Sequence, residues 1–408
     1  MRGILTYILA GGKGERLNPL TRDRAKPAVP FGGIYRIIDF TLSNCINSGL
    51  RRIYILIQYK SFSLQKHVLA GWGDIVSSQL GEFIDVIPAQ QRISSDWYRG
   101  TADAIHQNVY TIQDHNPDLI LILAGDHVYK MNYEKMIAYQ KATDADMVVS
   151  CVPLPVENAV SFGVIEVDQA GLICGFREKP KNPKTIPGDP DRVFASMGIY
   201  LFKKDVLLQE LEIDARSLTS EHDFGKNVIP QMLKNGKKIV VYNFVDKDNK
   251  PGYWRDIGTR DAYYQANMDL VRRTPDFNLF DRSWPVRTLH EQFPPIKLIH
   301  AEEDGKPVQG EVVDSLIAGG CIIEGAKIMG SILSPNVNIG ARASVVNSVI
   351  MEGVTIGARA KIKNAIVDKE VCVPPGAQIG YDLVKDRKRF DVTTSGIVIV
   401  PKRVLIQD

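Results

Sequence analysis

The sequence predicts an α/β protein in which a mostly parallel, doubly wound sheet is followed by a C-terminal parallel (left-handed) β-helix. Three observations predict this architecture. The first two-thirds of the 408 residues alternate short apolar strands with amphipathic segments. A proline-containing stretch without periodicity follows. Beyond about residue 305, apolar residues recur at a hexapeptide spacing. The length also fits two or three domains.

The N-terminal two-thirds contains four stretches rich in Ile, Leu and Val that we expect to be buried strands: residues 4–10, 53–58, 119–124 and 147–153. Longer amphipathic segments lie between them, such as 102–114 and 133–143, and this alternation favours helices on both faces of a parallel sheet. Ligands in such folds bind beyond the carboxyl ends of the strands. The motifs that follow the first and third strands are therefore the best site candidates.

The C-terminal region is expected to stack about four coils of a β-helix on one apolar column. Triplets of apolar residues begin 16 or 17 residues apart, with small residues at the corners. A β-sandwich would instead show period-two alternation with turns every 8–12 residues or so. The triplets are Ile317, Ile323, Met329; Leu333, Ile339, Val345; Ile350, Ile356, Ile362; and Val367, Val373, Ile379.

The predicted domain boundaries lie where the residue pattern changes. Residues 1–273 form the N-terminal catalytic domain, residues 274–305 a linker, and residues 306–408 a β-helix domain for assembly or regulation. Four prolines fall within residues 274–295.

The composition narrows the cellular setting and the partners. Lys and Arg total 50 against 47 Asp and Glu, a net charge of +3, which gives no argument for a nucleic-acid or membrane-surface partner. The five cysteines lie far apart without a C-x-x-C pair, as in a reduced cytoplasmic protein. No signal-peptide layout and no apolar run near the ~18 residues of a membrane span is found. We expect a soluble cytoplasmic protein.

A glycine-rich segment follows the first strand. Residues 9–17 read Leu-Ala-Gly-Gly-Lys-Gly-Glu-Arg-Leu, and glycines allow backbone N–H groups to approach a polyphosphate closely and to form positive-φ turns. Lys13, Arg16 and Lys26 would neutralise a triphosphate. A P-loop needs Ser or Thr after Gly-Lys, and a dinucleotide fingerprint needs a small residue at Leu17, so neither fits. Taken alone, the segment is equally compatible with a plain strand–helix turn.

Two aspartates occupy positions suited to a metal ion. Asp126 comes just past the third strand, and Asp256 comes just before a helix, with Gly258 permitting an unusual turn. A reaction at a phosphate group needs charge neutralisation, and Mg²⁺ supplies it through oxygen ligands. The alternatives are a strand-end turn for Asp126 and a helix N-cap for Asp256. His127 is expected to be structural, because Mg²⁺ prefers oxygen.

Several polar residues are candidates for a sugar-phosphate site. Lys179, held before a proline, suits a phosphate monoester, and Glu178 offers an acceptor for sugar hydroxyls. Gly163 would allow close approach of the sugar, while Ser196 and Asp223 would bond its hydroxyls. A solvated run of surface charge is the alternative for the Glu-Lys pair. The loop of Tyr98, Gly100 and Thr101 would shape the pocket between base and sugar.

Taken together, these strings resemble the bacterial ADP-glucose pyrophosphorylase family along essentially the whole chain. The most specific strings lie at residues 31–40, 97–104 and 123–130, and two further strings complete the match in family order, at 195–199 and 222–226.

The resemblance implies an enzyme that transfers AMP from ATP to glucose 1-phosphate, with Mg²⁺, for glycogen or starch synthesis. It implies Asp126 and Asp256 as metal ligands and Lys179 as the glucose 1-phosphate anchor. The other sugar-phosphate residues it implies are Tyr98, Gly163, Glu178 and Ser196. For ATP it implies Gly11, Gly12, Arg16 and Lys26, with Gln90 or Gln91 near adenine. The family is usually an allosterically regulated homotetramer.

One departure from the family bears on regulation. Many bacterial members carry a basic residue after Gly32-Gly33 that contacts a sugar-phosphate activator, and here that position is Ile34. Other cations remain for a sugar-phosphate or nucleotide effector, including Arg36 and the tail residues Lys385, Arg387, Lys388 and Arg389.

Three competing functions are distinguishable. A pyrophosphorylase for another pair of nucleotide and sugar phosphate, such as one that makes UDP-glucose, would differ in the nucleotide that it accepts. Acyl transfer by the β-helix would use a catalytic histidine, but the last histidine, His300, precedes the coils. A regulatory subunit with a dead site is disfavoured, since Asp126, Lys179 and Asp256 are all present.

Overall fold

The computed structural model describes residues 3–90, 97–169, 171–246, 248–303 and 305–406. The chain divides into two compact units, which we call the sheet unit and the β-helix unit. The sheet unit comprises Met1–Gly12, Phe40–Ser61 and Val68–Trp254. The β-helix unit comprises Lys13–Asp39, Phe62–His67 and Arg255–Asp408. The glycine-rich segment is thus divided after Gly12, and its basic residues belong with the β-helix.

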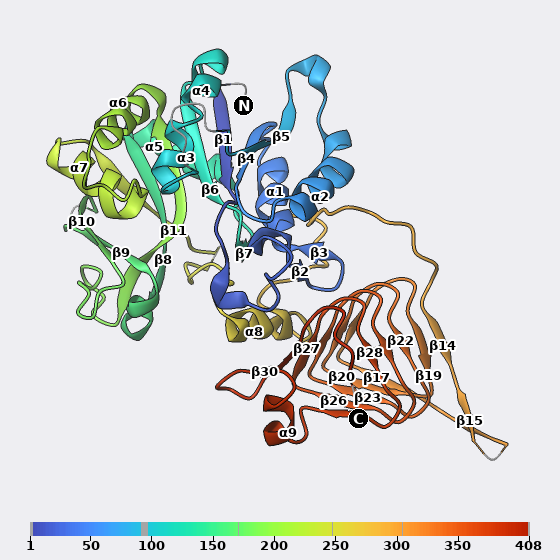
Figure 1. Ribbon diagram of the computed structural model, residues 1–408. Helices are drawn as coiled ribbons and strands as arrows, with labels where there is room; N and C mark the ends of the chain where they lie inside the picture. The colour runs from blue at the N-terminus through green and yellow to red at the C-terminus, as the bar shows by residue number, and fades with distance from the viewer. Residues whose placement is uncertain (1–2, 91–96, 170, 247, 304, 407–408) are drawn as a thin grey trace. The chain divides into compact units, whose positions relative to one another are not determined.

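The sheet unit is built on nine strands (Figure 1). Its strands are β1 (Ile4–Leu9), β4 (Arg52–Ile57), β5 (Phe83–Pro88), β6 (Leu119–Ala124), β8 (Met147–Pro155), β9 (Gly163–Val167), β10 (Ile173–Glu178), β11 (Arg192–Lys203) and β12 (Ile239–Asn243). Strands β5, β4, β1 and β6 run parallel in that order, as do β8 and β12. The long strand β11 is antiparallel to β6, β8 and β9, and β10 is antiparallel to β9. The predicted mostly parallel sheet is confirmed, with this antiparallel insertion.

The helices are α1 (Ile37–Asn47), α2 (Phe62–Trp72), α3 (Thr101–His106), α4 (Val109–His115), α5 (Tyr133–Thr143), α6 (Lys204–Ala215), α7 (Ile229–Lys234), α8 (Arg260–Leu270) and α9 (Leu383–Arg387). Helix α5 has the predicted bounds, whereas the segment predicted over 102–114 is broken into α3 and α4. At the break, Nδ2 of Asn108 donates to the carbonyl oxygen of Ala104 at 2.8 Å. Asn interrupts helices in this way because its side chain competes for backbone partners.

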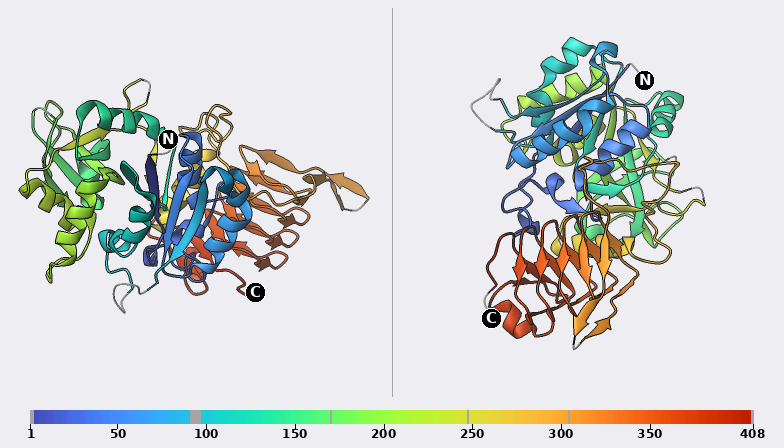
Figure 2. Two further views of the ribbon diagram at one scale, coloured as in Figure 1. Left: turned by 90° about the horizontal axis from the view of Figure 1, so that it is seen from above. Right: turned by 90° about the vertical axis from the view of Figure 1, so that its right-hand side faces the viewer.

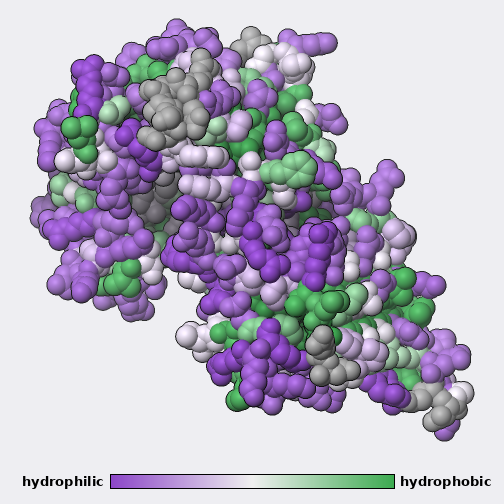
Figure 3. All heavy atoms as spheres, viewed as in Figure 1, coloured by the Kyte–Doolittle hydropathy of each residue, from purple (hydrophilic) through white to green (hydrophobic). Residues whose placement is uncertain are grey.

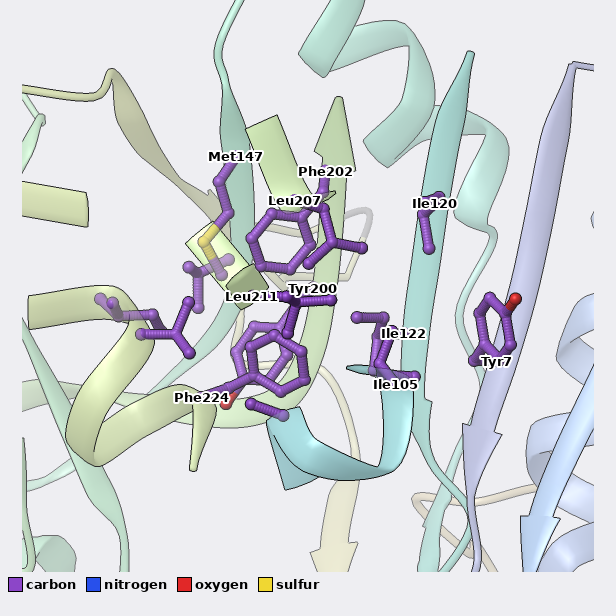
Figure 4. Packing of buried hydrophobic residues seen from close by; sticks show 14 of the residues in the cluster. Tyr7, Ile105, Ile120, Ile122, Met147, Tyr200, Phe202, Leu207, Leu211 and Phe224 are labelled. Carbon is purple, nitrogen blue, oxygen red and sulfur yellow. The ribbon is translucent and has the colours of Figure 1, made fainter. Parts of the chain in front are cut away.

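The hydrophobic core of the sheet unit lies between one face of the sheet and the helices α3, α4, α6 and α7. Figure 4 shows Tyr200, Phe202 and Phe224 packed together, and the ring centroid of Phe224 lies 5.6 Å from each of the other two. Neighbouring residues of one strand, Tyr7 and Ile8, are both 0% exposed. Because side chains alternate across a strand, both faces of the sheet are buried, as expected for parallel strands in an α/β fold.

The β-helix unit stacks its strands in three parallel sheets, seen as successive coils in Figure 2. The first sheet holds β14 (Lys297–Ile299), β19 (Ile322–Glu324), β22 (Asn338–Ile339), β25 (Thr355–Ile356) and β28 (Cys372–Val373). The second holds β17 (Glu311–Val313), β20 (Lys327–Met329), β23 (Ser344–Val346), β26 (Lys361–Lys363) and β29 (Gln378–Ile379). The third holds β18 (Leu316–Ile317), β21 (Ile332–Leu333), β24 (Val349–Ile350), β27 (Ala365–Val367) and β31 (Val398–Val400), with β30 (Asp391–Val392) antiparallel at its end.

Short strands complete the chain: β2 (Pro30–Phe31), β3 (Tyr35–Arg36), β7 (His127–Tyr129), β13 (Trp254–Asp256), β15 (Ala301–Glu303) and β16 (Lys306–Val308). No helix among the described residues has the length and hydropathy of a transmembrane span. On the face drawn in Figure 3, hydrophobic side chains gather over the β-helix unit, and hydrophilic ones cover most of the sheet unit.

The apolar column of the β-helix follows the predicted register with one correction. Ile323, Ile339 and Ile356 pair successively in one sheet. In the first coil, however, the residue that pairs with Val345 is Ile328, which is 0% exposed, and not the predicted Met329. The spacing from Ile323 to its neighbour in the column is therefore five residues rather than six, and Met329 takes the next, partly exposed position of the strand.

Candidate active site

The sheet unit contains a cavity of about 480 Å³ at the carboxyl ends of β1, β4 and β6. This is where ligands bind in sheets of this kind. Seven residues predicted from the sequence line it: Gly11, Gly12, Tyr98, Gly100, Thr101, Asp126 and Asp223. Other lining residues include Gln58, Tyr59, Arg99 and Tyr200.

The glycine-rich segment enters this cavity through Gly11 and Gly12. A Cβ built on Gly12 would meet no atom within 4 Å, so the backbone there borders open space that a phosphate can approach. The expected positive-φ turn occurs at Gly14 alone of the three glycines. Gly11 instead packs closely on the chain, since its Cβ would lie 3.3 Å from Cβ of Gln58.

Asp126 is the second residue after β6 and lines the cavity with a side chain that is 33% exposed. The turn that presents it is fixed by two hydrogen bonds. Gly125 N donates to the Leu9 carbonyl at 3.0 Å, and Thr41 Oγ1 donates to the Ala124 carbonyl at 3.0 Å. A partly exposed carboxylate at a strand end is suited to a hard cation.

His127 contacts both an aromatic ring and the neighbouring carboxylate. Its ring lies edge-on to Trp254, with centroids 5.1 Å apart and an interplanar angle of 79°. Its Nε2 is 3.5 Å from Oδ1 of Asp126. The structural role expected for His127 stays a prediction.

The loop after Trp97 is shaped by a close backbone approach. A Cβ on Gly100 would lie 2.2 Å from the carbonyl oxygen of His222, and Ala102 N donates to that same oxygen at 2.8 Å. Only glycine fits at position 100, because any side chain would displace the 222 backbone. His222 is itself buried, with Nδ1 2.8 Å from Oδ2 of Asp214. The Gly100 loop and the polar cluster after residue 220 thus form one wall.

Asp223 lines the cavity but has structural partners. Its Oδ2 accepts from Oγ1 of Thr101 at 3.0 Å. Its Oδ1 accepts from the backbone N–H groups of Gly225 and Lys226 at 2.9 and 3.1 Å, which caps the following helical turn. The carboxylate retains lone pairs for a ligand hydroxyl while being held in one orientation.

Tyr98 contributes a neutral hydroxyl. Asn108 Nδ2 donates to Tyr98 Oη at 3.0 Å, and burial raises the pKa of Tyr98. The phenol therefore stays protonated at neutral pH and keeps its O–H as a donor. Tyr200 on the cavity wall is also protonated, since burial raises its pKa as well.

Gln58 and Tyr59 are lining residues that the sequence reasoning missed. They follow β4, so the rule that ligands bind at carboxyl strand ends would have found them. Tyr59 also stacks on the exposed Trp97, with centroids 5.9 Å apart and planes 8° apart.

The predicted sugar-phosphate residues Gly163, Glu178, Lys179 and Ser196 are not among the residues that line this cavity. Lys179 has a φ of +47° and places Nζ 3.0 Å from Oε1 of Glu178, with both side chains well exposed. Gly163 has a packing role, since its Cβ would lie 2.5 Å from Cζ of Phe176.

Of the two predicted adenine residues, Gln90 is not among those that line the cavity. Gln90 is exposed just beyond β5, and Gln91 lies outside the described residues.

The three remaining predicted site residues, Arg16, Lys26 and Asp256, lie in the β-helix unit. Lys26 Nζ lies 2.9 Å from Oδ1 of Asp256, and these side chains are 10% and 21% exposed. A Cβ on Gly258 would lie 2.8 Å from Oδ2 of Asp256 and 3.3 Å from Nη2 of Arg16. Lys26 therefore pairs with Asp256, and both the Asp256 carboxylate and the Arg16 guanidinium border the Gly258 turn.

The N-cap alternative for Asp256 is wrong. The cap of α8 is Thr259, whose Oγ1 accepts from Ala262 N at 3.1 Å. Asp256 therefore does not cap the start of that helix.

Comparison with known families fits this division into a sheet and a hexapeptide column. Residues 5–273 match the family described as Nucleotidyl transferase, and residues 294–400 match the one described as GlmU-like, C-terminal hexapeptide. The fold and the site thus define a nucleotidyl transferase with a hexapeptide-repeat domain, a class that generally uses a divalent metal ion.

Curated relatives narrow the class to one enzyme family. The chain is 50% identical to a glucose-1-phosphate adenylyltransferase from Anaeromyxobacter dehalogenans, over 100% of this chain and 99% of that protein. It is 49% identical to one from Koribacter versatilis, over 98% of this chain and 95% of that protein. The chain belongs to the glucose-1-phosphate adenylyltransferase family, as the resemblance predicted. The alternative of a UDP-glucose enzyme is not favoured.

Proposed function

We propose that this protein transfers AMP from ATP to α-D-glucose 1-phosphate, giving ADP-glucose and pyrophosphate for glycogen or starch synthesis. The observation that carries the proposal is the end-to-end similarity to relatives of that name. The test is pyrophosphate release from glucose 1-phosphate with ATP, UTP, dTTP and GTP in parallel. Preference for any nucleotide other than ATP contradicts it.

The chemistry requires charge control more than proton transfer. The attacking phosphate oxygen is already ionised, so the protein has to align it and neutralise the triphosphate. The backbone at Gly11 and Gly12 accommodates phosphate oxygens, and Arg16 and Lys26 supply positive charge. Lys26 is held on Asp256 until a triphosphate offers a second anionic partner. The hydroxyls of Tyr98 and Thr101 and the carboxylate of Asp223 orient the ligand in the cavity.

Mg²⁺ is the proposed metal ion, with Asp126 and Asp256 as its protein ligands. The donor set fits, because both are carboxylates, and hard oxygen donors are what Mg²⁺ prefers. When bound, the ion neutralises charge on the transferring phosphate.

Lys179 is proposed to anchor the phosphate of glucose 1-phosphate, together with Glu178, Ser196 and Gly163, while Gln90 or Gln91 lies near adenine. We expect Lys179→Ala to raise KM for glucose 1-phosphate about 10- to 150-fold and to change KM for ATP little. The range corresponds to losing one charge-assisted contact of about 1.5–3 kcal/mol. Steady-state kinetics with each substrate varied in turn measures both constants.

The exposed Lys181, two residues further on, provides the matched control as Lys181→Ala. An equal rise in both constants for Lys179→Ala, or the same change in Lys181→Ala, would show that Lys179 is not selective for the sugar phosphate.

A phosphorylated effector is proposed to bind a second cavity, of about 280 Å³, within the β-helix unit. Arg36, Lys66, His67 and Lys369 line it, and so does Ile34, at the position where many family members are basic. The tail cluster is a weaker candidate than the sequence indicated. Arg389 is held within the tail, because its Nη2 lies 3.0 Å from Oδ1 of Asp386 and donates to the Gln378 carbonyl.

We expect Lys66→Ala to weaken the response to a sugar-phosphate activator at least several-fold, since it removes a cation from the cavity. Ile34→Lys should strengthen the response, because it adds one. Activation curves with fructose 1,6-bisphosphate, fructose 6-phosphate and AMP measure the half-saturating concentration. Lys385→Ala in the tail is the control, and an equal loss there would assign the effector to the tail.

Assembly as a homotetramer and a cytoplasmic location complete the proposal. The end strands β14 and β17 expose Leu298, Val312 and Val313, and Ile322 of the next strand is also exposed. Exposed strand ends with apolar side chains favour association with another chain. The boundaries at 273 and 305 stay a prediction, and β14 lies within the residues assigned to the linker.

A further inference from the structure

We propose that Asp368, in the β-helix, is a positioning residue for nucleotidyl transfer, because it holds the basic loop of residues 13–29 in place through Arg24. The proposal rests on the proposed function, since Arg16 and Lys26 of this loop are the residues assigned to the triphosphate.

The contact is a buried ion pair between residues 344 positions apart in the chain. Nη2 of Arg24 lies 2.8 and 3.0 Å from the two carboxylate oxygens of Asp368. The two side chains are only 7% and 2% exposed. Nη1 of Arg24 lies 3.8 Å from Sδ of Met351, in the preceding coil. Both partners belong to the β-helix unit.

Asp368 is itself fixed by the coil that carries it. It directly follows β27, and its N–H donates to the carbonyl oxygen of Val400 at 3.0 Å. Its Oδ1 also accepts from the N–H of Lys369 at 2.7 Å. The carboxylate therefore presents a rigid acceptor to the loop.

Only Ala25 separates Arg24 from Lys26, so the position of Arg24 constrains the position of Lys26. Ala25 is buried and extended, and Lys26 begins a 3₁₀ turn with Pro27 as its second residue. Proline restricts the backbone of its own residue and of the one before it. A shift of Arg24 should therefore move Lys26, whose Nζ lies 2.9 Å from Oδ1 of Asp256.

The start of the loop rests on the same segment. A Cβ on Gly14 would lie 3.1 Å from Cβ of Lys26, and Thr21 Oγ1 donates to the Gly14 carbonyl at 2.8 Å. Arg16 follows two residues later in the 3₁₀ turn Glu15–Leu17. The two cations assigned to the triphosphate are thus both supported from the Arg24 anchor.

The burial of the Arg24–Asp368 ion pair favours a positioning role for Asp368 over a purely stabilising one. Desolvation offsets most of the attraction between buried charges, and apolar residues of the same volume often stabilise a fold as well. An ion pair does fix direction and distance, which a group meant to meet a triphosphate needs to within a fraction of an ångström.

The experiment compares Asp368→Asn with a control from the same coil, Glu370→Gln. The first variant keeps the shape and loses the charge that holds Arg24. The control removes an exposed ion pair with Arg403. We expect Asp368→Asn to raise KM for ATP about tenfold and to lower kcat about tenfold, with KM for glucose 1-phosphate changed less than threefold. Glu370→Gln should leave all three near wild type.

Two further measurements separate positioning from general loosening. ATP affinity by calorimetry, which needs no turnover, should fall about tenfold in Asp368→Asn, and a melting curve records the fold. In Arg24→Gln combined with Asp368→Asn, the loss should be no larger than in the worse single variant, because both changes break the same contact. If Asp368→Asn does not fold, Arg24→Lys replaces it, with the same expected rise in KM for ATP.

A lowered melting temperature with wild-type ATP affinity would overturn the proposal, as would equal rises in both KM values. Failure of the proposed function looks different. In that case the wild-type protein itself would release no pyrophosphate from ATP and glucose 1-phosphate, whatever the variants do to ATP binding.

Discussion

Asp126→Asn should lower kcat by about three orders of magnitude or more and leave the fold intact. Asn has nearly the same shape, but it lacks the charge that a divalent cation requires from a ligand. Losing metal-held charge stabilisation of several kcal/mol corresponds to this range, since each ~1.4 kcal/mol is tenfold in rate. The side chain is partly exposed on the cavity wall, so the change buries no new polar group.

The measurement is pyrophosphate release over a range of Mg²⁺ concentrations, with circular dichroism and a melting curve for the fold. Asp118→Asn is the matched control, because Asp118 is exposed at the opposite end of the same strand, just before β6. A folded Asp126→Asn variant with more than a tenth of wild-type kcat would remove Asp126 from the metal site.

Part of the cavity of the sheet unit was predictable from one topological rule. Buried runs of Ile, Leu and Val mark parallel strands, and the carboxyl ends of those strands meet at one edge. Gly11, Gly12 and Asp126 were identified in this way and line the cavity. Gln58 obeys the same rule but was overlooked, since glutamine after a strand carries no distinctive chemistry by itself.

The grouping of the basic loop with the β-helix was not predictable from the pattern. Nothing local to Arg24 indicates a partner 344 residues away, because long-range ion pairs leave no periodic signal. The sequence pattern also did not show that Ile328, and not Met329, lies in the apolar column. A hexapeptide spacing assumes coils of constant length, and the first coil is one residue shorter between its column positions.

Gly100 was correctly predicted to border the pocket, but the sequence did not show why this position requires glycine. The sequence indicated a small-residue loop that shapes a ligand pocket, and Gly100 does line the cavity. Its need for glycine, however, comes from the His222 carbonyl oxygen, which a Cβ would approach to 2.2 Å. Such a tertiary approach is visible only once the two loops are placed together.

Lys26→Ala should lower kcat about 100- to 1,000-fold and also raise KM for ATP. Removing one preorganised donor to the charge that develops in a transition state typically costs about this much. Lys26 is preorganised in that sense, since it is 10% exposed, begins a 3₁₀ turn and lies 2.9 Å from Asp256 before any substrate is present. Lys26→Arg should recover only part of the rate, because a guanidinium does not reproduce the point charge of an ammonium group.

The same loop supplies the control for this prediction. Lys13 is 60% exposed, against 10% for Lys26, so solvent screens its charge more strongly. Lys13→Ala should therefore change kcat less than about tenfold, since an exposed surface cation contributes little on average. Steady-state kinetics of both variants, with ATP affinity from calorimetry, decides the matter. Equal losses in the two variants would show that loop charge in general, and not the fixed position of Lys26, assists the transfer.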